Sequence, residues 1–87
     1  MKNIAFTPSA FEQLNHWATK DKKIYRKTIT LINDVLRQPF SGLGKPEALK
    51  YELKGYWSRR ITDEHRLVYK VTDDEVIILS CQFHYGD

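Results

Sequence analysis

Three side chains that lie far apart in the sequence could together cleave RNA: Glu47, Arg66 and His84. Cleavage without a metal needs a base for the ribose 2′-hydroxyl proton, a cation for the phosphorane charge and an acid for the leaving 5′-oxygen. Glutamate can be the base, arginine contacts phosphate with a permanent charge, and histidine is a suitable acid near neutral pH. Each residue alone is a weak signal, so the hypothesis requires a fold that brings the three together.

Basic residues are concentrated in the same region of the chain. Between Lys45 and Lys70 there are seven basic and four acidic residues, an excess of three that equals the whole-chain net charge of +3. Such local charge points to a polyanionic partner. Arg59 and Arg60 are therefore either edge charges or phosphate contacts. A second basic cluster, at 20–27, begins a predicted helix and is either a solvated face or an RNA contact.

Size and composition indicate one globular domain over 1–87. Hydrophobic residues make up 41% and charged residues 29% of the chain, which is typical of a folded protein rather than a disordered one. The single cysteine, Cys81, cannot form an internal disulfide and falls in an apolar run, so we interpret it as a buried thiol. The three histidines lack zinc-site spacing, and we expect no metal and no cofactor. No signal peptide or membrane span is recognisable, so we expect a cytoplasmic protein.

The first half of the chain predicts a short strand at 2–6 followed by two helices. Thr7 with Pro8, or Ser9 with Glu12 as a capping box, can begin a helix that runs to about Thr19. A second helix begins after Asp21, its apolar residues recur at helical spacing, and Pro39 prevents its continuation. Because the link between them is short, the two helices should form an antiparallel pair.

The second half alternates with a period of two residues and predicts four strands, at 50–53, 56–62, 66–71 and 76–84. Odd-numbered residues form the apolar row in the last three, as Ile61, Tyr69 and Leu79 illustrate. Arg60, Arg66 and His84 should then share the open face of a mainly antiparallel sheet, with the helices on the other face. This α+β arrangement requires an odd number of residues between the second and third strands, such as 63–65 with Thr62 opposite Arg66.

The run GKPEALK, the block LKGYWSRRITDEHRLVY and the closing HY resemble the YoeB-type toxins of the RelE/ParE superfamily of toxin-antitoxin systems. The resemblance extends over almost the whole chain. It implies a RelE-like, microbial-ribonuclease-like sheet and a toxin that enters the ribosomal A site, cleaves the mRNA there and inhibits translation. It also implies inhibition by an antitoxin of the YefM type and a possible homodimer.

Carried to this sequence, the resemblance implies Glu47 as general base, His84 as general acid and Arg66 as the phosphate-stabilising cation. It further implies that Lys50 and Arg60 support RNA or phosphate binding and that Tyr85 closes the site. Gly86 and Asp87 follow the HY pair, where chains of this type tend to stop, and this departure leaves the placement of Tyr85 open.

Two other functions remain open at this stage. A toxin of the ParE branch shares the fold but binds DNA gyrase without catalysis. A degenerate RNA-binding module would keep the basic patch and lose the chemistry. The candidate set Glu47, Arg66 and His84 favours the nuclease, because a gyrase binder does not need an acid–base pair.

Overall fold

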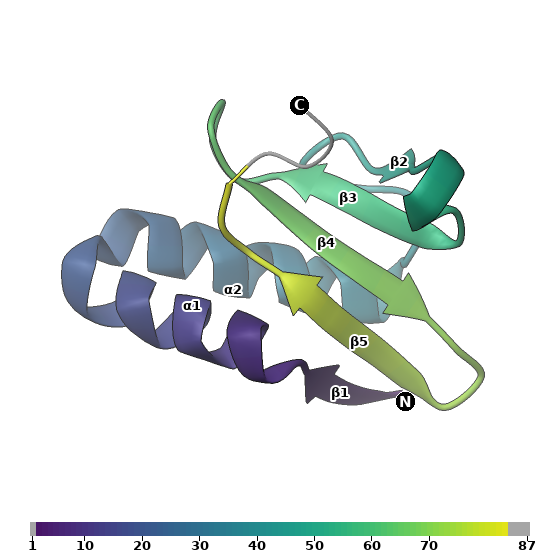
Figure 1. The fold of residues 1–87 in the computed structure, drawn as a ribbon, viewed down its shortest axis with the longest axis horizontal. Helices are drawn as coiled ribbons and strands as arrows, with labels where there is room; N and C mark the ends of the chain where they lie inside the picture. Colours follow the sequence, from purple (N-terminus) through teal and green to yellow (C-terminus); the bar gives the residue numbers. More distant parts are fainter. Residues whose placement is uncertain (1, 84–87) are drawn as a thin grey trace.

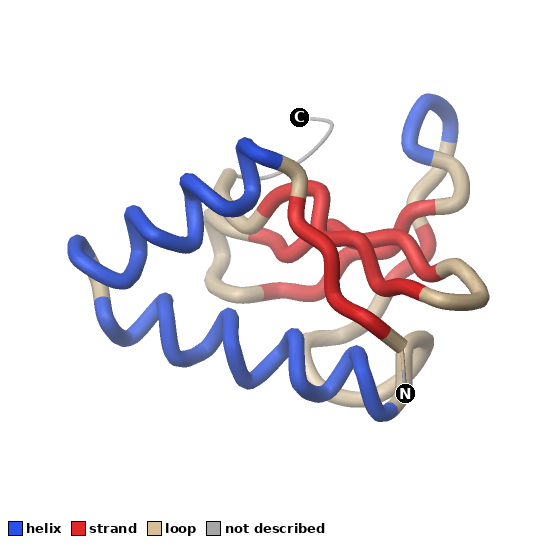
Figure 2. The backbone as a smooth tube through the Cα atoms, turned by 90° about the horizontal axis from the view of Figure 1, so that it is seen from below, coloured by secondary structure: helices blue, strands red, loops and turns tan. Residues whose placement is uncertain are grey.

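The protein folds into a five-stranded sheet with two helices on one of its faces, as a computed structural model shows (Figure 1, Figure 2). The structure describes residues 2–83. The elements are β1 (Asn3–Phe6), α1 (Pro8–Lys20), α2 (Lys22–Arg37), β2 (Glu47–Ala48), the 3₁₀ helix η1 (Tyr51–Leu53), β3 (Tyr56–Arg60), β4 (Arg66–Val71) and β5 (Glu75–Ser80). Their order in the sheet is β1-β5-β4-β3-β2, and only the β1–β5 pair among them is parallel. The predicted α+β fold is confirmed.

Local capping chemistry fixes where both helices begin. The Thr7 hydroxyl accepts a hydrogen bond from the Ala10 N–H at 3.1 Å, with Pro8 in the first turn, so the first of the two predicted caps is the one used. The Asp21 carboxylate accepts from the Lys23 and Ile24 N–H groups at 3.1 and 3.2 Å. One residue therefore separates the helices, which lie side by side as an antiparallel pair (Figure 1).

The strand predicted at 50–53 is wrong, and the strand in this region is shorter and earlier. Glu47 and Ala48 pair with Ser58 and Trp57, and the Leu49 N–H donates to the Tyr56 carbonyl. β3 begins at Tyr56, so in this register no residue of β3 lies opposite residues 50–55. The chain therefore turns there into η1 instead of continuing as a strand.

The odd-numbered apolar row is correct in β3 and β4 but wrong in β5. Leu67 and Tyr69 are fully buried, as predicted, whereas in β5 the buried residues are Val76 and Ile78. Tyr69 lies opposite Ile78 while Val68 lies opposite Ser80, so Leu79 is an extra residue at a β-bulge. A bulge shifts the side-chain alternation by one position, which the sequence pattern did not reveal.

Truncating Ile78 should therefore destabilise the protein more than truncating Leu79. Ile78→Ala leaves a cavity among fully buried neighbours and should lower the free energy of unfolding by about 2 to 5 kcal/mol. Leu79 is partly exposed, so Leu79→Ala should cost clearly less in urea denaturation. Equal losses, or a larger loss at Leu79, would contradict the facing of β5.

The connection between β3 and β4 contains an odd number of residues, as predicted. It is longer than the three residues, 63–65, that were given as an example. Arg60 pairs with Arg66, which leaves five residues between them. The Ile61 and Thr62 N–H groups both donate to the His65 carbonyl, at 3.0 and 3.2 Å, and close the loop. An odd connection keeps Arg60 and Arg66 on the same face of the sheet, opposite the helices.

Candidate active site

Glu47 lies on the edge strand β2 and is exposed. It pairs with Ser58, which in turn pairs with Val68, so these three residues form one row across the face that is turned away from the helices. The loop before it is attached to the sheet, because the Arg60 N–H donates to the Gly44 carbonyl at 2.7 Å. Gly44 has a φ of +77°, and a Cβ there would lie 2.9 Å from a Leu31 methyl carbon. Only glycine lets the loop pass this close to α2.

Arg66 begins β4 on the same face and is only 9% exposed. Its Nη1 donates to three carbonyls of the preceding loop, those of Thr62 at 2.5 Å, Asp63 at 3.0 Å and His65 at 3.2 Å. The guanidinium is thus held in a defined place before any ligand binds. Such preorganisation is what electrostatic stabilisation of a developing charge requires.

Glu47, Arg60 and Arg66 share one face, since Arg60 pairs with Arg66 and lies two residues from Ser58. Two strand spacings separate β2 from β4, which corresponds to about 10 Å. Glu47 is also offset from the Arg60–Arg66 pair by two residues along the strands. Arg60 is exposed on this face, and Lys50 is exposed just before η1, near the Tyr56 end of β3. The predicted partners His84 and Tyr85 lie outside the described residues.

The prediction that Arg59 contacts RNA phosphate is wrong, because this side chain is completely buried on the helix side of the sheet. All five of its N–H groups donate internally. Nε donates to the Tyr69 hydroxyl at 3.2 Å, and the two terminal nitrogens donate to the Asp34 carboxylate and to carbonyls of 38, 41 and 43 at 2.6 to 3.1 Å. Arg59 therefore ties the loop after α2 to the sheet and adds no charge to the open face.

Asp34 is the partner that sequence reasoning missed. It is 3% exposed and lies 2.6 Å from the Arg59 guanidinium. The Leu43 N–H, followed by Arg37, Arg59 and Gln38, holds the pKa of the Asp34 carboxyl well below its usual range. A signal was available, because the alternation of β3 already placed Arg59 on the inward face, where a charge needs a buried acid.

Two further ionisable groups lie in the core. Cys81 is fully buried, which confirms the buried-thiol interpretation, and burial raises the pKa of its thiol to about 12 and so disfavours the thiolate. Burial also raises the pKa of Tyr69, whose hydroxyl donates to the Pro39 carbonyl at 2.7 Å.

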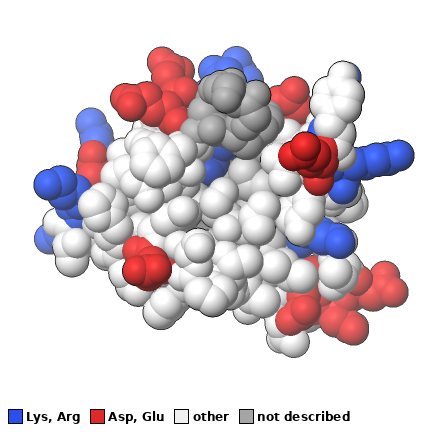
Figure 3. Space-filling model, in the orientation of Figure 1, with Lys and Arg blue, Asp and Glu red and all other residues white. Residues whose placement is uncertain are grey.

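Charged side chains of both signs are spread over the face drawn in Figure 3. In Figure 3, Lys and Arg side chains project beside the turn between α1 and α2, and Asp and Glu side chains gather beside the β4–β5 hairpin.

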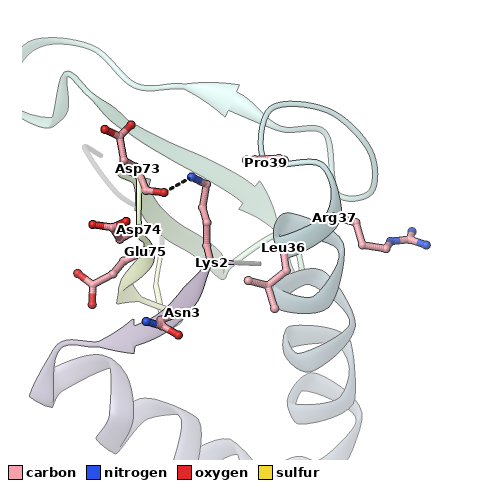
Figure 4. A pocket seen from close by; sticks show the side chains of 8 residues that line it. All are labelled: Lys2, Asn3, Leu36, Arg37, Pro39, Asp73, Asp74 and Glu75. Carbon is pink, nitrogen blue, oxygen red and sulfur yellow. Dashed lines mark hydrogen bonds between the residues drawn. The ribbon is translucent and has the colours of Figure 1, made fainter.

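A cavity of about 830 Å³ lies between the β4–β5 hairpin, β1 and the end of α2 (Figure 4). Lys2 lines it and donates to the Asp73 carbonyl at 2.8 Å. None of Glu47, Arg60 and Arg66 lines this cavity.

Residues 2–83 contain no group of three or more His, Cys, Asp or Glu side chains that could hold a metal ion. Within the same residues no helix, α1 and α2 included, is long and apolar enough to cross a membrane.

Comparison with known proteins identifies close relatives along nearly the whole chain. Residues 6–85 match the model of a YoeB-like toxin of a bacterial type II toxin-antitoxin system. Toxin YoeB of Mycobacterium bovis is 52% identical over 85 residues, which cover 98% of this chain and 100% of the relative.

Solved structures agree with this match. A YoeB dimer from Staphylococcus aureus superposes with a TM-score of 0.90 and 47% identity, covering 97% of this chain and 98% of the other. YoeB in a heterotetrameric YoeB–YefM complex from the same organism gives 0.89 and 46%, covering 98% and 99%. This chain therefore belongs to the family of YoeB-like toxins of bacterial type II toxin-antitoxin systems.

Proposed function

We propose that this toxin is a ribosome-dependent endoribonuclease that cleaves mRNA in the ribosomal A site and so inhibits translation in the cytoplasm. The observation that carries the proposal is the common face of Glu47, Arg60 and Arg66, opposite the helices. That face combines an exposed carboxylate with a guanidinium already fixed by the loop carbonyls. Such a pair has the chemistry needed for a reaction at a phosphodiester.

The reaction begins at the ribose 2′-hydroxyl. Glu47 removes its proton, and the oxygen attacks the adjacent phosphorus. Arg66, supported by Arg60 and Lys50, stabilises the extra negative charge of the phosphorane. His84 gives a proton to the departing 5′-oxygen, and Tyr85 closes the site. The products are a 2′,3′-cyclic phosphate and a free 5′-hydroxyl, and no cofactor takes part.

The antitoxin partner is a protein of the YefM type. The Staphylococcus aureus relative forms a complex with YefM, and this chain covers 99% of that toxin at 46% identity. A homodimer is the second assembly, as in the YoeB dimer from the same organism. Binding of such an antitoxin would hold the toxin inactive.

Primer extension on mRNA in a purified translation reaction tests the activity. The wild-type protein should produce new 5′ ends within the A-site codon, and no such ends should appear when ribosomes are omitted. Addition of a YefM-type antitoxin should suppress them. Intact mRNA in the presence of ribosomes would contradict the proposal. The alternative function, binding to DNA gyrase, would then be the one to test.

Salt should weaken ribosome binding, because phosphate contacts release counterions. Arg60 is exposed on the proposed RNA face, so Arg60→Gln should lower affinity and reduce the slope of log K against log salt by about 1. Lys54→Gln, at an exposed lysine in the turn after η1, is the matched control. A slope that does not change in Arg60→Gln would remove this arginine from the RNA-binding surface.

A further inference from the structure

We infer that His65 is a positioning residue for the cleavage reaction, because its ring holds the backbone that leads directly into His84. The inference rests on the proposed function and adds to it a residue that touches no RNA. His65 lies in the loop between β3 and β4, at the start of the strand that carries Arg66. It therefore links the backbone of Phe83, the residue before His84 in the sequence, to the start of β4.

The described residues after β5, 81–83, are held mainly by side chains of other elements. The β5 strand ends at Ser80. Beyond it, the Cys81 N–H donates to the Gln13 Oε1 at 2.7 Å, and the Cys81 carbonyl accepts from the Trp17 Nε1 at 2.9 Å. Both partners belong to α1, so the helix fixes the segment at its first residue.

Phe83 is the next fixed point, and its two backbone polar groups are bound by the last residue of the β3–β4 connection and by the first residue of β4. Its N–H donates to the His65 Nδ1 at 2.8 Å, and its carbonyl accepts from the Arg66 N–H at 3.1 Å. Phe83 has a φ of +65°, in the left-handed region that side chains other than glycine rarely occupy. Such a conformation persists only where the surroundings hold it, and here the two hydrogen bonds do so.

His65 is itself well anchored. Its N–H donates to the Thr62 hydroxyl at 3.1 Å, and its carbonyl closes the loop. Its ring packs edge-on against Trp17, with 4.7 Å between ring centroids. The ring can therefore transmit a defined position from the core to Phe83. Because Nδ1 accepts the Phe83 N–H, the ring must be neutral with its proton on Nε2.

Two substitutions separate the hydrogen bond from the ring packing. His65→Phe keeps a ring against Trp17 but has no acceptor. His65→Asn loses the ring but places Oδ1 as many bonds from Cα as Nδ1. Removing one such bond corresponds to a loss of roughly threefold to tenfold. His65→Phe should therefore lower kcat by that factor with unchanged ribosome Kd, whereas His65→Asn should keep most of the wild-type kcat.

Two NMR measurements on the free toxin do not depend on activity. The Phe83 amide should exchange with solvent faster in His65→Phe than in the wild type and should stay protected in His65→Asn. In the wild type, the ring nitrogen shifts of His65 should show Nε2 protonated and Nδ1 unprotonated. This second readout needs no variant, and a proton on Nδ1 would overturn the inference.

The outcomes are distinguishable from those of the proposed function. A wild-type protein that leaves mRNA intact would overturn the proposed function and the role of His65 with it. A wild type that cleaves, together with a His65→Phe protein of equal kcat, would overturn the role of His65 alone. Equal losses in His65→Phe and His65→Asn would also overturn it, because the acceptor would then not be what matters.

Discussion

Glu47→Gln and His84→Ala should each slow mRNA cleavage by on the order of a hundredfold or more, because each removes one proton-transfer group. Glu47→Gln keeps the size of the side chain and removes its negative charge and its basicity. Glu47 is exposed on an edge strand, so the fold should be retained. The rate is measured by primer extension under single-turnover conditions on programmed ribosomes, with the melting temperature as the test of folding.

Matched controls exist for both substitutions. Glu52→Gln alters an exposed glutamate on η1, and His16→Ala alters an exposed histidine on α1. Both control proteins should cleave like the wild type. Near-wild-type cleavage by Glu47→Gln and by His84→Ala would refute the acid–base assignment. A His84→Ala protein that does not fold would instead show that this histidine has a structural role.

Arg59→Met should lower the free energy of unfolding by about 3 to 5 kcal/mol, the usual cost of removing one partner of a buried ion pair. The substitution leaves the Asp34 carboxylate buried without its 2.6 Å partner. It also removes the donors that bind three loop carbonyls and the Tyr69 hydroxyl. Urea denaturation followed by circular dichroism measures the loss.

Arg60→Met is the neighbouring control, and because Arg60 is exposed it should change stability little. A double variant, Arg59→Met with Asp34→Leu, should recover part of the loss, since no buried charge then remains unpaired. A stable Arg59→Met protein would mean that Arg59 is not the anchor of the loop, and the phosphate-binding role would need to be considered again.

The helical half of the fold was predictable from sequence because its determinants are local. Thr7 with Pro8 and Asp21 mark the two helix starts, and the structure uses each of them as a cap. The alternation in β3 and β4 was equally legible, since Leu67 and Tyr69 face the core as expected. In these elements each residue's preference is decided by its near neighbours in the chain.

The candidate site was only partly predictable. Its residue types were visible in the sequence, and the odd-numbered connection correctly put Arg60 and Arg66 on one face. The role of Arg59 was misjudged, because a charged residue in a basic segment looks like an RNA contact until its distant partner Asp34 is seen. The anchoring of Phe83 by His65 likewise joins residues that are 18 positions apart.

The sequence by itself determined the helix boundaries, the mainly antiparallel sheet and the set of candidate side chains for the proposed reaction. These follow from capping, from apolar periodicity and from side-chain chemistry, all of which act over a few residues. Tertiary structure alone decided the bulge at Leu79, the burial of Arg59 and the hold on the C-terminal segment. Each of these depends on which strand or helix lies opposite, and a pairing between distant segments is fixed only when the whole core packs.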